Sequence, residues 1–274
     1  MFLPIWWNCS PSSVATRRSV RRRGNRDTMR RNSCNARPPW RQGAATISTI
    51  ENGPASGSSK PSATRLCIEP DRNCQLCPRL ASFRAATRAR EAEWFNSPVP
   101  SFGDPSGRLL IIGLAPGLQG ANRTGRPFTG DYAGDLLYTT LIEYGFAKGV
   151  YKARPDDGLT LVDCLISNAV RCVPPQNKPL PAEINNCRPF LAASIAAMPN
   201  LRAIVPLGRV AHESAAMALG LRRSSVPFAH GAIHQADRLK IYDSYHCSRY
   251  NTNTGVLTPK MFRQVFAKVR ADLD

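Results

Sequence analysis

Four of the nine cysteines in this sequence are placed where metal ligands could be. Cys74 and Cys77 form a Cys-x-x-Cys pair, and Cys172 and Cys187 follow much later, with fourteen residues between them. Four thiolates from two separated segments can hold a tetrahedral zinc ion or a 4Fe–4S cluster. A zinc ribbon would usually present a second Cys-x-x-Cys pair, which this chain lacks. The spacing therefore favours a 4Fe–4S cluster, with buried apolar cysteines as the plain alternative.

A second group of residues suited to chemistry follows three short apolar runs. These runs end in Gly113-Leu-Ala-Pro-Gly117, in Ser167-Asn168 and in Tyr245-His246. Short apolar runs bounded by glycine or proline are typical of buried strands. Ligands of parallel sheets gather beyond the carboxyl ends of the strands, so we expect the chemistry of this protein at these strand ends.

The elements that must position these residues alternate along the chain. Apolar runs predict four strands, at residues 108–114, 161–168, 203–208 and 239–245. Helical patterns predict five helices, at residues 79–95, 134–146, 181–198, 209–219 and 258–273. Strands that alternate with helices imply a parallel sheet covered on both faces. We therefore expect an α/β fold of three layers, α/β/α, around a central, mostly parallel four-stranded sheet.

The chain is strongly basic, with 37 Lys and Arg residues against 19 Asp and Glu residues and a net charge of +18. Residues 1–60 hold eleven of the basic and two of the acidic residues, which amounts to half of the net charge. The remaining 214 residues still carry 26 basic and 17 acidic residues. Because this larger part is basic by itself, we expect an anionic partner, first nucleic acid and second acidic lipid.

The first 65 residues differ in composition from the rest of the chain. They lack helical or strand periodicity and end in a stretch rich in Gly, Pro and Ser. We expect residues 1–65 to be a disordered basic tail, or the product of a start codon assigned too far upstream, and residues 66–274 to form the folded domain. The apolar stretch Met1–Trp7 precedes its arginines, which is the reverse of a secretory signal. We expect a cytoplasmic monomer without a membrane span, with a mitochondrial presequence as the alternative.

Three motifs, in order, resemble those of the family-5 uracil-DNA glycosylases, the iron–sulfur-containing, thermophile-B-like branch of that superfamily. The first runs from Gly113 to Asp131, the second from Ser167 to Pro175 and the third from Tyr245 to Gly255. The similarity covers about residues 67–274, and the four-cysteine spacing accompanies the three motifs. Together, these features make the resemblance specific.

Two positions depart from the patterns of the related families. Family 5 usually has proline where Cys247 stands. Proline would stiffen the loop that presents His246, so its absence leaves the rigidity of this loop open. Family 4 reads Gly-Glu-Ala-Pro-Gly in its first motif, and Leu114 stands at the position of that glutamate. No side chain between Gly113 and Gly117 could therefore act as a base.

The resemblance implies a DNA-repair hydrolase that flips uracil out of DNA and cleaves its N-glycosidic bond, which leaves an abasic site. Removal of other deaminated bases is left open. The partner would be DNA that contains the damaged base, and the cofactor a 4Fe–4S cluster on the four spaced cysteines. The residues that bind the base would be Gly113, Ala115, Pro116, Gly117, Phe128 and Asn168.

The resemblance also assigns roles within the site. Phe128 would stack on the base and Asn168 would pair with its hydrogen-bonding edge. His246 would donate a hydrogen bond to the departing base, and Asp131 would position water or stabilise the sugar cation. Arg249 and Asn251 would contact the phosphates and the minor groove.

Each of these residues also has an ordinary structural explanation. Phe128 could be a core residue, Asn168 a turn residue, and His246 a core histidine with satisfied hydrogen bonds. Asp131 could be the N-cap of the helix that starts near Tyr132, and Arg249 part of a solvated loop. Two other functions also stay open, a uracil-specific glycosylase of the family-4 kind and a non-enzymatic iron–sulfur module that binds nucleic acid.

Overall fold

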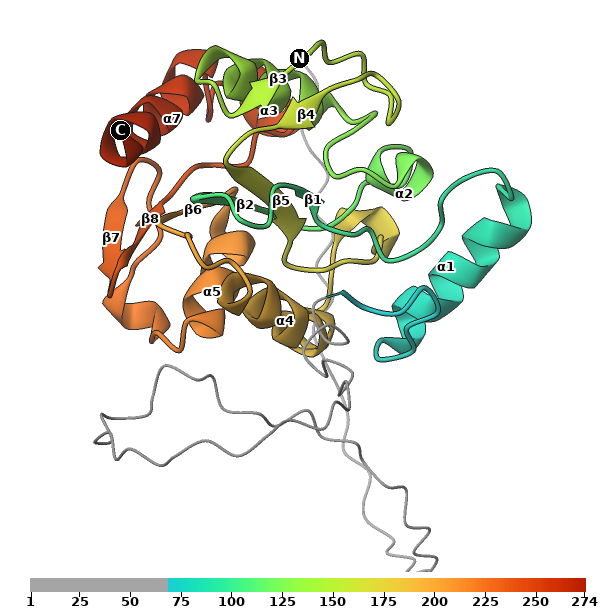
Figure 1. The fold of residues 1–274 in the computed structure, drawn as a ribbon. Helices are drawn as coiled ribbons and strands as arrows, with labels where there is room; N and C mark the ends of the chain where they lie inside the picture. Colours follow the sequence, from blue (N-terminus) through green and yellow to red (C-terminus); the bar gives the residue numbers. More distant parts are fainter. Residues whose placement is uncertain (1–68) are drawn as a thin grey trace, which may run out of the picture. The chain divides into compact units, whose positions relative to one another are not determined.

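Residues 69–274 are described by the computed structural model of the chain, and Figure 1 shows how their elements are arranged. The expectations for the tail at residues 1–65 lie outside the described residues. Within residues 69–274, no helix combines the length and the apolar character that crossing a membrane would require.

A six-stranded sheet forms the middle layer, with its strands in the order β1-β5-β2-β6-β8-β7. The four inner strands are parallel to one another: β5 (Cys164–Asn168), β2 (Leu109–Gly113), β6 (Ala203–Pro206) and β8 (Leu239–Tyr242). The outer strands, β1 (Phe102–Gly103) and β7 (Ile233–Ala236), run antiparallel to their neighbours. All residues of β2 and β5 are buried, as their continuous apolar sequences predict.

Helices cover both faces of the sheet (Figure 1). Helices α3 (Tyr132–Glu143) and α7 (Pro259–Leu273) lie on one face, and α4 (Pro181–Ala196) and α5 (Arg209–Ala218) lie on the other. Strand β2 feeds both cores, because Leu109 and Ile111 belong to the first and Leu110 and Ile112 to the second. This alternation follows from the period of two along a strand.

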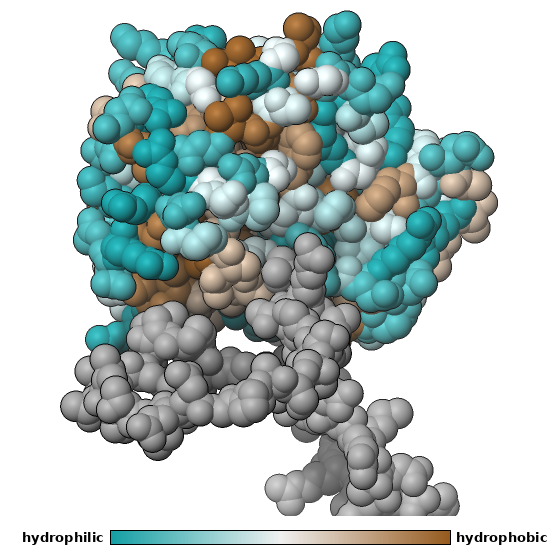
Figure 2. Space-filling view, viewed as in Figure 1, coloured by the Kyte–Doolittle hydropathy of each residue, from teal (hydrophilic) through white to brown (hydrophobic). Residues whose placement is uncertain are grey.

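Shorter elements complete the domain. Helix α1 (Pro78–Arg90) precedes the sheet, α2 (Ala121–Thr124) follows β2, and α6 (Arg249–Asn253) precedes α7. Strands β3 (Ala147–Lys148) and β4 (Thr160–Leu161) form a separate antiparallel pair. Two 3-10 turns lie at Pro175–Asn177 and Arg223–Ser225. The face seen in Figure 2 is mainly hydrophilic, with apolar residues in scattered groups.

The three-layer α/β/α architecture and the mostly parallel sheet are confirmed, but the expectation of four strands is wrong, because the sheet has six. The two additional strands are edge strands with weak sequence signals. Strand β1 has two residues, one of them Gly103, and β7 reads Ile-His-Gln-Ala without an apolar run. Three expected boundaries also differ. The helix at 79–95 ends at Arg90, the strand at 239–245 ends at Tyr242, and residues 160–161 pair with β3 outside the main sheet.

Candidate active site

The carboxyl ends of β2 and β5 place two of the predicted residues side by side. Gly113 and Asn168 are direct partners in the parallel register of these strands. A Cβ atom on Gly113 would overlap both the Asn168 amide oxygen and the ring of Phe128. Gly113 therefore gives the space in which Phe128 and Asn168 come together. Asn168 is only 3% exposed, yet no hydrogen bond among residues 69–274 uses its side-chain amide.

The backbone of Phe128 is held in an unfavourable conformation by its neighbours. Its φ of 53° lies in the left-handed region, which a bulky residue rarely adopts. The Tyr151 hydroxyl donates to the Phe128 carbonyl at 3.0 Å, and the Tyr138 hydroxyl donates to the Pro127 carbonyl at 2.6 Å. Gly134 packs directly under the Phe128 carbonyl. Such strain persists where the surroundings fix the geometry, and it is frequent at binding sites.

His246 lies close to Phe128. The two ring centroids are 6.0 Å apart with an angle of 30° between the ring planes. The Cβ of His246 packs against Gly208 at the start of α5. Within residues 69–274, neither ring nitrogen of His246 takes part in a hydrogen bond. Burial lowers the pKa of His246 to about 4, so its imidazole is neutral at neutral pH.

Asp131 does not act as the N-cap that its position suggests. Its backbone occupies the N-cap position of α3, but its side chain makes no capping hydrogen bond. The carboxylate instead packs against Gly117 and Gly120, where a Cβ atom at either glycine would collide with it. Burial raises the pKa of Asp131, while the Ala121 backbone amide and the charge of Arg123 oppose this shift. The two glycines of the first motif therefore make room for a carboxylate.

Two contacts tie the His246 loop to the start of α3, next to Asp131. The Cys247 thiol lies 3.5 Å from the Ala133 carbonyl. The Arg249 guanidinium lies over the Tyr132 ring, 5.2 Å from its centroid. Both predicted catalytic residues are thus carried by adjoining segments. Cys247, which is fully buried, fills the position of the missing proline with an apolar contact.

The predicted DNA contacts differ in what their side chains do. Arg249 is exposed, as a phosphate contact requires. Asn251 donates its amide to the His246 carbonyl at 2.8 Å, so this donor stabilises the loop.

Two predicted base-binding residues of the first motif, Ala115 and Pro116, have different surroundings. Pro116 is buried, while the Ala115 side chain packs on the hydrophobic cluster that contains Cys172 and Cys187. The first motif therefore lies between the base-binding residues and the cysteines.

The four spaced cysteines converge. Cys74, Cys77, Cys172 and Cys187 line one apolar cavity, together with Pro70, Leu76, Leu80, Arg84, Val170, Asn186 and Phe190. Three donors point at their sulfur atoms. The Arg84 guanidinium lies 3.2 Å from Cys172 Sγ, the Arg171 backbone amide 3.2 Å from Cys187 Sγ, and the Asn186 amide 3.7 Å from Cys77 Sγ. Donors of this kind stabilise thiolates bound to iron.

The spacing of these sulfur atoms distinguishes between the two metal centres. Four thiolates at about 2.3 Å from one zinc ion would lie about 3.8 Å from one another. Within residues 69–274, the one group of three or more potential ligand atoms within 4.8 Å of one another is His212, His234 and Asp243. No three of the cysteine sulfur atoms in the described residues therefore lie within 4.8 Å of one another. Burial raises the pKa of Cys172 to about 11, so without a metal this thiol stays protonated at neutral pH.

Comparison with known proteins identifies the family. Residues 100–270 match the family model described as the Uracil DNA glycosylase superfamily. The chain belongs to the uracil DNA glycosylase superfamily. It is 42% identical over 203 residues to the type-5 uracil-DNA glycosylase of Thermus thermophilus, a match that covers 72% of this chain and 92% of that protein. The type-5 enzyme of Pyrobaculum aerophilum is 37% identical over 204 residues, which is 73% of this chain and 89% of the relative.

Similarity to the type-4 branch of the superfamily is lower. The type-4 uracil-DNA glycosylase of Pyrobaculum aerophilum is 29% identical over 165 residues, which is 60% of this chain and 70% of that protein. The resemblance to the type-5 group is confirmed, and the type-4 alternative is not favoured. Leu114 stands where the type-4 pattern has glutamate, which agrees with this assignment.

The sequence analysis did not identify the residues that support the Phe128 segment, Arg126 and Asp157. Arg126 is 5% exposed and forms two hydrogen bonds with Asp157, at 2.8 and 2.7 Å. Its guanidinium also lies over the rings of Tyr138 and Tyr151, which hold the Phe128 segment. The sequence held one signal, because Arg126 falls inside the first motif. Nothing local marks Asp157, which lies in a polar loop and becomes a partner only through the fold.

Proposed function

We propose that this chain removes uracil from DNA by hydrolysing the N-glycosidic bond, which leaves an abasic site. The observation that carries the proposal is the arrangement around Gly113. Phe128, Asn168 and His246 converge there from three segments far apart in the sequence, and both polar side chains lack hydrogen-bond partners among residues 69–274. Asn168 is almost fully buried and His246 is half-buried. Buried polar groups normally have partners, so these two side chains are available to a ligand.

The arrangement suits a flipped pyrimidine. An aromatic face binds a base by stacking, and a side-chain amide offers a donor and an acceptor to its hydrogen-bonding edge. Phe128 supplies the face and Asn168 the amide. The amide must be aimed before the base arrives, and its almost complete burial beside β2 restricts its rotation.

The chemical step requires stabilisation of charge on two groups. Cleavage of the bond gives the sugar cationic character, and the leaving base gains negative charge. His246, neutral at neutral pH, can donate one N–H to the base as this negative charge develops. Asp131 is the carboxylate that can position the attacking water or stabilise the sugar cation. We assign these two roles because the segments that carry both residues adjoin at Tyr132 and Ala133.

We further propose that Cys74, Cys77, Cys172 and Cys187 hold a 4Fe–4S cluster. The shared apolar cavity, the wide sulfur spacing and the donors aimed at the sulfurs support this choice over a single zinc ion. The cluster would supply a covalent link from the residues just before α1 to Cys172 and to Cys187 within α4. Ala115 packs against the same group of residues, so this link would also support the first motif.

The test is incubation of the protein with oligonucleotides that each carry one uracil, followed by alkali, which breaks the strand at an abasic site. We expect breakage that depends on uracil. Asn168→Ala should abolish most of it, while Asn200→Ala, at an exposed amide bonded to the Ser106 carbonyl, should not. Strands that stay whole although the protein binds them would contradict the proposal and support the binding module. Parallel oligonucleotides with hypoxanthine, xanthine or mismatched thymine would define the substrate range.

A further inference from the structure

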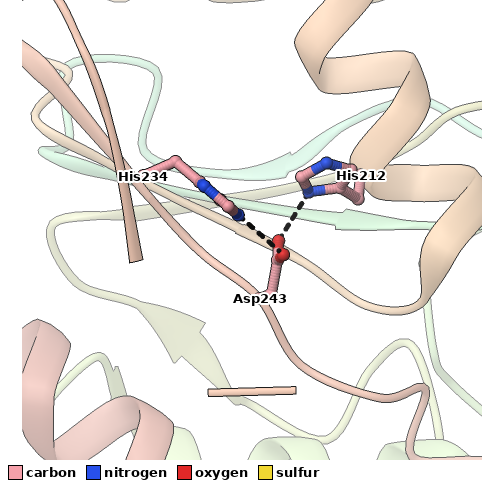
Figure 3. A group of neighbouring side chains, drawn as sticks. All are labelled: His212, His234 and Asp243. Carbon is pink, nitrogen blue, oxygen red and sulfur yellow. Dashed lines mark hydrogen bonds and ion pairs between the residues drawn. The ribbon is translucent and has the colours of Figure 1, made fainter. Parts of the chain in front are cut away.

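His212, His234 and Asp243 form a cluster in which His212 and Asp243 are buried and His234 is half-buried (Figure 3). His212 belongs to α5 and His234 to β7, while Asp243 follows β8 directly. His212 Nδ1 lies 2.6 Å from one oxygen of the Asp243 carboxylate, and His234 Nε2 lies 3.1 Å from the other. His212 and Asp243 are at most 1% exposed. The carboxylate therefore joins two imidazoles from separate elements.

Hydrogen-bond partners fix the charge of His212. Its Nε2 lies 2.7 Å from the Val226 carbonyl, which can only accept, so this nitrogen carries a proton. Its Nδ1 faces the Asp243 carboxylate and carries a proton when that carboxylate is ionised. Burial lowers the pKa of His212, but the hydrogen bond and charge of Asp243 outweigh burial and leave the pKa raised. His212 and Asp243 therefore form a buried ion pair.

The geometry favours hydrogen bonds over a bound metal ion. Each imidazole takes a different carboxylate oxygen, and the Ala229 backbone amide donates to Asp243 as well, at 3.3 Å. A metal ion would need the two imidazole nitrogens to turn toward a common centre. In Figure 3 both rings instead point at the carboxylate itself. The cluster is thus an anion held by three donors.

This carboxylate connects two loops. Segment 226–232 contacts the cluster through the Val226 carbonyl and the Ala229 amide. The same segment holds the backbone of residues 243–245. The Gly231 amide donates to the Asp243 carbonyl at 2.8 Å, the Asp243 amide to the Ala232 carbonyl at 2.9 Å, and the Tyr245 amide to His230 Nδ1 at 3.1 Å. His246 is the next residue, so the cluster fixes the support of the loop that carries it.

We propose that Asp243, held between His212 and His234, is a positioning residue that fixes the loop carrying His246 against Phe128. This inference rests on the proposed glycosylase activity and names the group on which its geometry depends. The loop that carries His246 needs this external support for two reasons. Cys247 replaces a stiffening proline, and the His246 ring has no hydrogen-bond partner of its own within residues 69–274. The neighbouring loops must therefore set the ring's position.

The other charged or titratable groups near His212 do not replace this pair. Glu213 follows it on α5 and raises its pKa, as the last of the causes. Arg209 lies over the Phe228 ring, 5.7 Å from its centroid. His230 is kept neutral by burial, which lowers its pKa, and its Nδ1 accepts from Tyr245. A proton lost from His212 would therefore leave the Asp243 charge without its closest cation.

The first experiment measures single-turnover excision of uracil at saturating protein. Asp243→Asn should lose roughly 10- to 100-fold in rate, the scale of a small misplacement of a reacting group, with affinity for DNA nearly unchanged. The matched control is Asp163→Asn, which breaks an ion pair with Arg108 at the opposite ends of the strands. It should lower stability and leave excision intact. Equal rates for Asp243→Asn and wild type, or equal losses in both variants, would overturn the proposal.

The second experiment follows pH. A raised pKa means that His212 holds Asp243 at pH values below it and releases Asp243 as the pH rises through it. The wild-type excision rate should therefore show a fall on the alkaline side. His212→Asn keeps a donor but no charge, so its rate should be low throughout and lack this fall. If the variant shows the same alkaline fall as wild type, His212 does not control the loop.

A third measurement does not depend on activity. Nitrogen NMR of the histidine rings should show both nitrogens of His212 protonated at pH 6, and Asp243→Asn should shift the His246 ring signals while Asp163→Asn leaves them in place. Unshifted His246 signals would overturn the proposal even in a chain that excises no uracil, so the two failures are distinguishable. One zinc ion per chain, lost in Asp243→Asn but kept in Cys187→Ala, would also overturn it.

Discussion

His246 and Asp131 lie in surroundings that suppress the charge of both. Burial lowers the pKa of the imidazole to about 4 and raises the pKa of the carboxyl group. A neutral imidazole keeps one ring N–H, and this N–H can donate a hydrogen bond to the departing base. A carboxylate that is costly to ionise gains from a nearby cation, and the sugar becomes one as the bond breaks. The two shifts are therefore consistent with the proposed roles.

We predict that His246→Ala loses roughly 100- to 1000-fold in single-turnover excision of uracil, the usual cost of one preorganised donor. Binding to DNA should stay nearly unchanged, because the His246 ring lies beside Phe128 at the candidate site. A base that leaves more easily should suffer less, since it depends less on the donor. Excision at the parental rate would transfer the role to Asp131 or to the backbone of residues 115–117.

Asp131 gives a prediction about pH. If the ionised carboxylate is required, excision falls as the pH drops through its folded-state pKa, which burial places above the ordinary 3.8. Asp131→Asn should remove this acid limb, with a moderate loss of rate if the residue only positions water and a loss as large as that of His246→Ala if it acts as a base. A pH–rate profile of both proteins measures this. An unaltered acid limb in the variant would show that another group titrates.

Asp131 and Phe128 show how much of the candidate site could be predicted from sequence alone. Asp131 stands at a helix start, where an N-cap and a catalytic carboxylate look alike. The structure excludes the capping hydrogen bond, because the side chain turns toward Gly117 and Gly120 and leaves the helix uncapped. The left-handed backbone of Phe128 had no signal, since it is imposed by Tyr151 and Gly134 from elsewhere in the chain.

At the scale of elements, the buried strands were predictable and the edge strands were not. Strands β2, β5 and β6 are continuous apolar runs because both of their faces are covered. Edge strand β7 exposes Ile233 and Gln235 and joins β8 through a turn in which Asp237 has a φ of 54°. Asn-Gly or Asp-Gly would have signalled such a turn, but the sequence here is Asp-Arg. The pair β3 and β4 likewise depends on contacts that only the fold creates.

The proposed cluster joins the residues just before α1 to Cys172 and to Cys187 in α4, so its loss should destabilise α1 and α4 together. We predict that the purified protein is yellow-brown, as thiolate-bound iron is, and that Cys187→Ala loses colour and thermal stability together. Cys164→Ala is the matched control, because Cys164 is equally buried but lies in β5 away from the cavity. It should lose stability and keep its colour. A colourless native protein that contains zinc would reject the iron assignment.

At the scale of the whole chain, charge is divided evenly between two parts of very different sequence. Residues 1–60 and residues 61–274 each contribute half of the net charge of +18, but the second part has more than three times the length. The first part carries its charge at high density and without apolar periodicity. The described domain holds all the residues assigned to chemistry. Charge that attracts DNA in general is thus separable from the groups that recognise a base.

Deletion of residues 1–65 tests this separation. We predict that the truncated protein folds and excises uracil at the parental single-turnover rate, because every residue of the candidate site and all four cavity cysteines lie beyond the cut. Affinity for undamaged DNA should fall at low salt, and the dependence of binding on salt should become less steep, since fewer phosphates are neutralised. Binding isotherms at several salt concentrations, with excision rates alongside, measure both effects. A truncated protein that is unfolded or inactive would show that the first 65 residues contribute to the domain itself.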